Sequence, residues 1–187
     1  LYGIENDLLK LINLYKKDKL PSKILLSGQK GIGKCTLAYH LINFILSSGE
    51  KYSYDIEKFR INLENKSFKL IQNQTNPNFT LLDVASDKKE IDITQIRNLI
   101  SKLNKSSFNS KPRFVLIDNI ENLNINSINA LLKILEEPNK NIYFLLIHNN
   151  RRILPTLKSR CLDFRISLSN KETINICEKL LNSNLSN

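Results

Sequence analysis

The chain has 187 residues, of which 41% are apolar and 25% are charged, and its formal net charge is +10. These values fit one globular domain with a buried core, and they exclude a disordered or fibrous protein. No apolar run is long enough to span a membrane, and the N-terminus lacks the residue order of a signal peptide, so we expect a cytoplasmic protein.

Three cysteines, Cys35, Cys161 and Cys177, lie far apart and in no spacing typical of metal ligands. A sparse, odd number of cysteines is typical of reduced thiols inside the cell. We therefore expect no structural zinc ion in this protein.

The positive charge favours a polyanionic partner, because a basic surface attracts nucleic acid at long range and in a salt-dependent way. Basic residues gather at 15–19, at 102–113 and at 151–160. A simpler interpretation also fits, in which lysine only keeps a chain rich in Lys, Asn and Ile in solution. Composition alone leaves both interpretations open.

The first predicted unit is a strand followed by a glycine-rich loop and a helix. Residues 22–28 (SKILLSG) form a short apolar run that ends in glycine, which is typical of a buried strand. Apolar residues then recur at helical spacing through 34–47. Strand, glycine loop and helix together form the context in which a phosphate-binding loop is credible.

Residues 48–77 are polar and weakly patterned, so we expect a loop with one short helix that ends in a turn at 76–78. A second strand is predicted at 79–84. An amphipathic helix follows at 92–106, and Asp92 stands where its N-terminal cap belongs.

The rest of the chain continues the alternation of strands and helices. A third strand is predicted at 113–118, and the next helix carries an apolar stripe from Ile128 to Leu135 before Pro138 halts it. A fourth strand at 142–149 and a fifth at 161–166 precede a last helix that begins at Lys171.

This order predicts an α/β protein with a five-stranded parallel sheet that helices cover on both faces, a three-layer α/β/α arrangement. Ligands bind such sheets at the carboxyl ends of the strands. Gly28, Asp118 and the pair His148-Asn149 all fall at such ends.

The glycine loop has most of the groups needed to hold phosphate. Its backbone N–H groups can surround phosphates because Gly28, Gly31 and Gly33 tolerate the dihedral angles required, and the following helix adds positive charge at its N-terminus. Lys34 would reach the outer phosphates. The next residue is Cys35, where the motif needs a hydroxyl for Mg²⁺, and a thiol is a poor ligand for so hard an ion.

Thr36 cannot supply that hydroxyl, because one helical step turns its side chain by about 100°. A second chemical defect follows the third strand. Asp118 can hold Mg²⁺ through water, but the next position needs a carboxylate to activate the attacking water and carries Asn119 instead. We interpret Glu121, two residues further on, as a solvated or capping acid. Phosphate-loop ancestry is thus predicted, while nucleotide binding stays open.

A third feature is the stretch LKSRC at 157–161, in the turn before the last strand. Arg160 in that turn would face a neighbouring molecule. Its planar, forked and permanently charged guanidinium suits a phosphate across an interface, although an isolated surface arginine is usually only solvated.

Taken together, several stretches resemble the clamp-loader branch of AAA+ proteins in their order and spacing, and within it the delta prime subunits of bacterial DNA polymerase III. They are GQKGIGKCTLAYHLINFIL, IDITQIRNLISKL, FVLIDNIENLNINSINALLKILEEPNKNIYFLLIHN and LPTLKSRC. The most specific are NALLKILEEP at 129–138 and the triplet SRC at 159–161.

The resemblance covers residues 1–168 as an AAA+ sheet domain and implies that 169–187 begin a small helical lid domain, with the family's collar domain absent. It implies a hetero-oligomer in DNA replication, whose tau/gamma motor subunits and delta subunit work with this chain to load the sliding clamp on primed DNA. Arg160 would be a finger donated in trans to a motor subunit, with Ser159 and Cys161 fixing its turn. We expect no required cofactor and no zinc, and binding of ATP or ADP is possible.

The resemblance also implies that a delta prime subunit is a rigid stator, which fits Cys35 and Asn119. Many relatives carry a four-cysteine zinc module that residues 48–77 lack. An alternative is an active motor ATPase like the tau/gamma subunit. Another is a stand-alone DNA-binding module with tight, salt-sensitive affinity.

Overall fold

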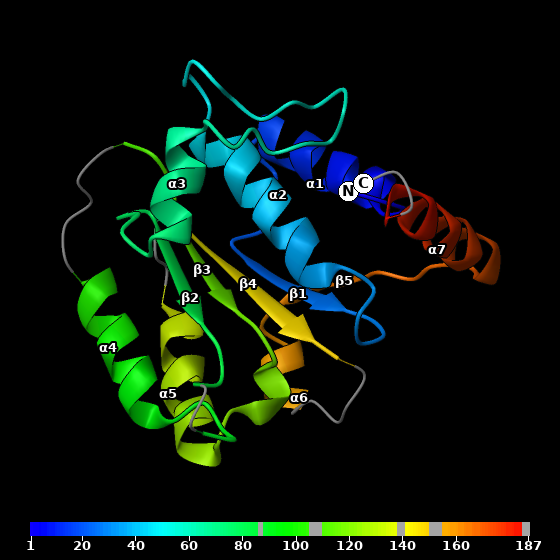
Figure 1. Cartoon of the computed structure of the whole chain (residues 1–187). Helices are drawn as coiled ribbons and strands as arrows, with labels where there is room; N and C mark the ends of the chain where they lie inside the picture. Colours follow the sequence, from blue (N-terminus) through cyan, green and yellow to red (C-terminus); the bar gives the residue numbers. More distant parts are fainter. Residues whose placement is uncertain (86–87, 105–109, 138–140, 150–154, 185–187) are drawn as a thin grey trace.

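The computed structural model describes residues 1–85, 88–104, 110–137, 141–149 and 155–184 (Figure 1). Its centre is a five-stranded sheet with the order β2-β3-β4-β1-β5, in which every pair of neighbouring strands is parallel. The strands are β1 (Lys23–Ser27), β2 (Phe79–Leu82), β3 (Arg113–Ile117), β4 (Ile142–His148) and β5 (Leu162–Arg165). All five predicted strands are therefore confirmed, each with shorter bounds than predicted.

Helices cover both faces of this sheet (Figure 1). They are α1 (Glu5–Lys16), α2 (Lys34–Leu46), α3 (Lys66–Gln72), α4 (Ile93–Leu103), the 3₁₀ helix η1 (Ile120–Asn122), α5 (Ile125–Glu136), α6 (Pro155–Lys158) and α7 (Asn170–Asn184). α1 and α6 were not predicted. The helix predicted at 92–106 ends at Leu103, and Pro138, expected to halt α5, lies outside the described residues.

The alternation of side chains along the strands divides the core into two layers. Ile24 and Leu26 of β1 pack with α1 and α2, whereas Leu25 faces the layer beneath α4 and α5. β3 divides in the same way, because Phe114 lies in the first layer and Val115 in the second. The predicted three-layer α/β/α arrangement is confirmed.

The expected cap of α4 is also confirmed. The Asp92 carboxylate accepts a hydrogen bond from the backbone N–H of Gln95 (3.1 Å), and the Gln95 side chain accepts one from the backbone N–H of Asp92 (3.1 Å). This reciprocal pair satisfies two backbone donors at the start of the helix. It fixes where α4 begins.

Between α2 and α3 the chain has little regular structure and is tied to α2 by buried polar contacts. His40 Nδ1 lies 2.7 Å from the Tyr54 hydroxyl, and the Asn43 amide donates to the side-chain oxygen of Asn65 (3.2 Å). Burial lowers the pKa of His40 to about 4. Side-chain hydrogen bonds thus order this segment against the domain.

None of the helices in the described part of the chain is long and apolar enough to cross a membrane.

Candidate functional site

The glycine loop joins β1 to α2. It needs glycine at its start for space and at its end for backbone conformation. A Cβ atom on Gly28, whose φ is +150°, would lie 2.3 Å from the carbonyl oxygen of Ile166. Gly33 caps α2 in the left-handed region, with φ of +90°. The loop therefore packs directly on the chain that leaves β5.

Lys34, the predicted phosphate ligand, is buried, with only 2% of its surface exposed. Its ammonium group donates hydrogen bonds to the carbonyl oxygens of Gly28 (3.0 Å) and Gln29 in its own loop. Burial lowers the pKa of Lys34, and the charges of Asp118 and Glu121 oppose this shift. The lysine is thus satisfied by its own loop.

Cys35 follows at the first turn of α2, beside Asp118. Burial raises the pKa of the Cys35 thiol to about 12, and the charge of Asp118 and a hydrogen bond to it contribute further. The thiol therefore keeps its proton at neutral pH. Thr36 is exposed on another side of the helix, as the helical step predicts. Neither side chain offers Mg²⁺ a hydroxyl beside Asp118.

Asn119 stands after β3 in the left-handed backbone region, with φ of +52°. Its side-chain NH₂ donates to the Asp83 carboxylate (2.9 Å), and its side-chain oxygen accepts from the amide of Asn149 (3.0 Å). The ends of β2, β3 and β4 are thereby linked by one chain of hydrogen bonds. Asp83 was not predicted as a site residue, because the predicted strand 79–84 included it, whereas β2 ends at Leu82 and leaves Asp83 at the strand end.

Two buried polar atoms at this edge have no hydrogen-bond partner within the described residues: Oε2 of Glu121 and Nε2 of His148. We expected Glu121 to be a solvated or capping acid; it lies in the first turn of η1 and is partly exposed, but its Oε2 atom is buried. Its short helix turns the carboxylate inward, toward the loop side of the sheet, where it acts on the pKa of Lys34.

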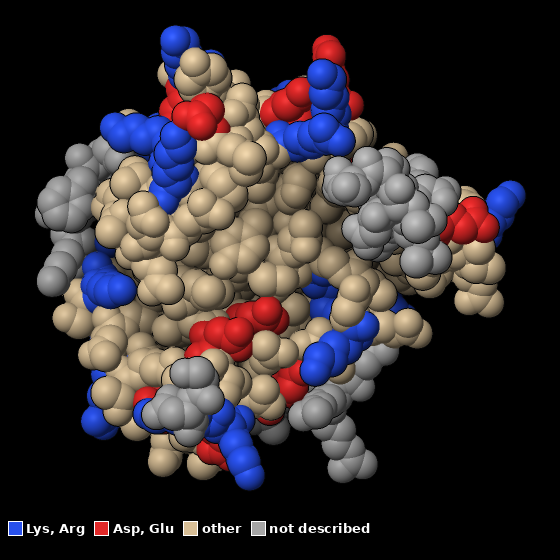
Figure 2. Space-filling model, viewed as in Figure 1, with Lys and Arg blue, Asp and Glu red and all other residues tan. Residues whose placement is uncertain are grey.

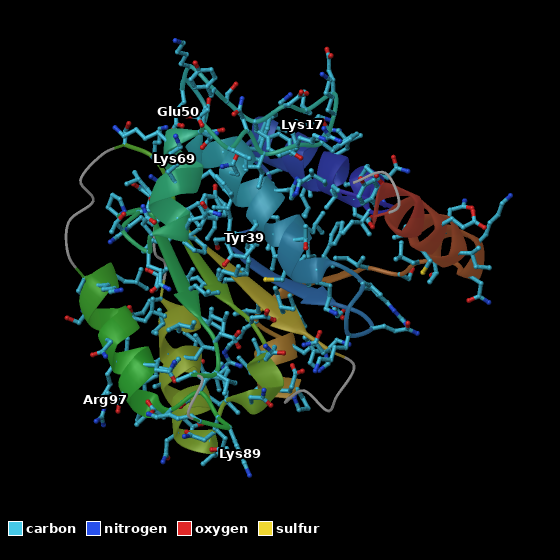
Figure 3. All side chains as sticks on the ribbon, in the orientation of Figure 1. Lys17, Tyr39, Glu50, Lys69, Lys89 and Arg97 are labelled. Atoms are coloured by element: carbon cyan, nitrogen blue, oxygen red, sulfur yellow. The ribbon has the colours of Figure 1, made fainter. Side chains whose placement is uncertain are left out.

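The carboxyl edge is acidic around this loop. Figure 2 shows acidic side chains gathered in a hollow near the middle of one face, with lysines and arginines spread around the rim. Tyr39 lies near the centre of the same face (Figure 3), and its ring is 5.7 Å from that of Phe79. Burial, with the nearby Cys35 and Asp118, raises the pKa of Tyr39 to about 12.

Arg160 lies in the turn between α6 and β5, as predicted. Its Nε atom donates to Oε1 of Glu136 (2.9 Å), Nη2 donates to the same oxygen, and Nη1 donates to the carbonyl oxygen of Thr156 (2.9 Å). The Ser159 hydroxyl also donates to Thr156 (3.1 Å), and Cys161 packs on the core beneath α5. The side chain of Arg160 remains 33% exposed.

The structure brings Gly28, Lys34, Cys35 and Asp118 together at the carboxyl ends of the strands. It places Arg160 at the opposite side of the sheet, where the strands begin. β5 runs parallel to β1, and Ile24 is paired with Leu162, so the turn at Arg160 lies beside the start of β1. The five residues of β1 separate the two edges by about 16 Å. Arg160 therefore lies far from the glycine loop of its own chain.

The family described as "DNA polymerase III, delta subunit" matches residues 4–170, which is most of the chain. The chain belongs to this family. The delta' subunit of DNA polymerase III from Buchnera aphidicola subsp. Schizaphis graminum is 31% identical over 169 residues, covering 89% of this chain and 49% of the relative. The DNA polymerase III gamma subunit of the same organism is 31% identical over 163 residues, covering 87% and 42%.

A solved structure shares the fold of this delta-family chain. It is a DNA polymerase III, gamma subunit-related protein from Thermotoga maritima, with a TM-score of 0.58 and 21% identity over 86% of this chain and 47% of that one. The chain spans about half the length of the curated relatives that it matches.

Proposed function

We propose that this chain is the stator, or delta prime, subunit of a bacterial clamp loader, which helps to place the sliding clamp on primed DNA during replication. In this role it hydrolyses no ATP itself and lends Arg160 to the ATP site of a neighbouring motor subunit. Membership of the delta family supports the assembly, and the residues of the carboxyl edge support the stator role.

The observation that carries the proposal is the state of Asn119. ATP hydrolysis needs a general base at this position, and an amide cannot accept the proton of the attacking water. The Asn119 amide is moreover committed to Asp83 and Asn149, so it is a poor group for orienting a water molecule. A carboxylate in its place would face the charge of Asp83.

Magnesium-bound ATP fits this edge poorly for two further reasons. The Cys35 thiol keeps its proton and offers no hard oxygen, and the Lys34 ammonium is already bound by the loop carbonyls. Binding of ADP or ATP without turnover is compatible with the glycine loop, and no cofactor is required for the stator role.

The position of Arg160 supports donation to another subunit. The opposite edge of the sheet is too far from the chain's own loop for a side chain to bridge. A guanidinium held at a surface turn can instead meet phosphate oxygens on a subunit that docks there. The partners would be the tau/gamma motor subunits and the delta subunit, with the sliding clamp reached through the assembly.

The stator role is tested by the ATPase activity of the purified chain. We expect no Mg²⁺-dependent turnover above background, and we expect Lys34→Ala to change nothing. Hydrolysis that disappears in the Lys34→Ala variant would contradict the proposal. It would support the second candidate, a motor ATPase, which the intact Gly28, Gly33, Lys34 and Asp118 and the similarity to a gamma subunit favour.

The trans role of Arg160 is tested in the reconstituted loader. Replacing it by alanine should lower ATP turnover of the complex by a factor on the order of 10³, as removal of an arginine finger does. Nucleotide affinity of the isolated chain should be unchanged, because the site that Arg160 completes lies elsewhere. Unchanged turnover by the variant complex would refute this assignment.

A role in DNA binding is the least specific part of the proposal. The net charge is +10, yet the basic side chains on the face shown in Figure 2 surround an acidic hollow and form no continuous patch there. We expect the isolated chain to bind duplex DNA weakly. Tight binding without other subunits, with a steep loss of affinity as salt rises, would favour a stand-alone DNA-binding module.

A further inference from the structure

We propose that Glu136 is the positioning residue for Arg160, which it holds ready to present two N–H groups outward to an anionic oxygen pair. The proposal rests on the trans role of Arg160 and adds a residue from a different element to it. Glu136 is the last residue of α5, 24 positions before Arg160 in the sequence.

The hydrogen bonds of the guanidinium divide its donors into two sets. Arginine has five N–H bonds, and three are used: Nε and Nη2 donate to Oε1 of Glu136, and Nη1 donates to the carbonyl oxygen of Thr156. One N–H remains on each terminal nitrogen. Two donors on neighbouring nitrogens match the spacing of two oxygens of a phosphate group.

Glu136 is suited to this role because it stands on a rigid element. Leu131, Ile134 and Leu135 of α5 are buried in the core beneath the sheet, so the end of the helix is fixed relative to the turn. The C-terminus of a helix also carries partial negative charge, which favours a cation beside it. Both effects keep the guanidinium in place.

The ion pair between Arg160 and Glu136 orients the guanidinium and adds little to the stability of the fold. The side chains of Arg160 and Glu136 are 33% and 56% exposed, and exposed ion pairs contribute little to folding. An arginine without such a partner would have to order its flexible side chain each time a subunit docks. Ordering it in advance lowers that cost, and misplacement of a catalytic group slows turnover.

The neighbouring Glu137 provides a matched control. It carries the same charge, is exposed, and makes no hydrogen bond or ion pair with Arg160 in the part of the chain that the structure describes. Replacing either glutamate changes the net charge by the same amount. A difference between the two variants therefore reports the contact itself.

The experiment measures ATP turnover of the reconstituted loader carrying Glu136→Ala, Glu136→Gln, Glu137→Ala, Arg160→Ala or the double variant Glu136→Ala/Arg160→Ala. We expect Glu136→Ala to lower kcat about three- to tenfold with KM unchanged, since a misplaced group costs turnover and not ground-state binding. Glu136→Gln should retain most activity, because its amide oxygen can still accept from Nε and Nη2. Glu137→Ala should behave like the unmodified complex.

The double variant separates positioning from a general structural role. If Glu136 acts only through Arg160, Glu136→Ala/Arg160→Ala should be no slower than Arg160→Ala alone. A further loss in the double variant would overturn the proposal. So would equal activity of Glu136→Ala and Glu137→Ala, or faster turnover by Glu136→Ala, provided that Arg160→Ala remains strongly impaired. If Arg160→Ala itself is fully active, the trans role fails and the proposal about Glu136 fails with it.

Discussion

Lys34 and Arg160 lie at opposite ends of the strands of one sheet, and different kinds of partner hold their side chains. Lys34 is 2% exposed, and neutral carbonyl oxygens of its own loop bind its ammonium group. Arg160 is 33% exposed, and a carboxylate from another helix orients it. Both are cations suited to phosphate, but only the second is partly exposed to solvent. The comparison shows that burial and partner geometry, more than charge, determine whether a cation is available to a ligand.

The largest expected effect concerns the glycine loop as a structural element. Gly28→Ala would place Cβ 2.3 Å from the Ile166 carbonyl oxygen at a φ of +150°, so it should destabilise the fold by about 3 kcal/mol. Gly31→Ala, at a φ of +86° with no atom within 4 Å, should cost only about 1 kcal/mol. Urea unfolding of both variants measures the difference. Equal losses would show that the loop does not depend on its contact with Ile166.

The next effect concerns the contact of His40 in α2 with Tyr54, in the segment between α2 and α3. Burial lowers the folded-state pKa of His40 to about 4, below an unfolded value of about 6.5, so the folded state binds fewer protons between these values. The contribution is complete above pH 6.5 and falls by up to about 3 kcal/mol as the pH drops toward 4. Chemical denaturation across this range, compared with His40→Gln, isolates it. Identical pH profiles would contradict the prediction.

A third test measures how fast a thiol reagent modifies Cys35, next to the glycine loop. With its pKa raised to about 12, the Cys35 thiol should react with iodoacetamide on the order of 50-fold more slowly than the exposed Cys177, since the fraction of thiolate falls faster than its nucleophilicity rises. Mass spectrometry of partly alkylated protein gives both rates in one sample. Comparable labelling of the two cysteines at pH 8 would mean that the loop opens readily.

The smallest effect is expected on the Arg160 side. Arg160→Ala and Glu136→Ala should each change the free energy of unfolding by less than about 1 kcal/mol, because the pair is exposed. Thermal or urea unfolding of the purified chain measures this. A large destabilisation would mean that the turn supports the fold, and it would remove the contrast with the loop.

The sheet could be predicted from the sequence because its strands are short apolar runs bounded by polar or glycine residues. α1 was missed, although Leu8, Leu11 and Ile12 recur at helical spacing and are buried. The charged and polar residues between these apolar positions made the helical pattern hard to recognise. α6 has four residues, which is too few for any periodicity to appear.

The separate residues of the site could be predicted, but not their partners. The link through Asp83, Asn119 and Asn149 requires β2, β3 and β4 to be neighbours, and strand order is not written in local patterns. The pairing of Arg160 with Glu136 likewise requires the end of α5 to lie beside the turn before β5. Such contacts depend on how distant segments pack.

The placement of the two cations at opposite ends of the strands gives the domain a direction. A subunit that donates from one end and accepts at the other associates head to tail, and such heterologous contacts build rings or open arcs. In this chain the accepting end has lost its chemistry while the donating end is intact, on the function proposed above. Such a subunit belongs at the terminus of a row, where one of its two ends needs no catalytic neighbour.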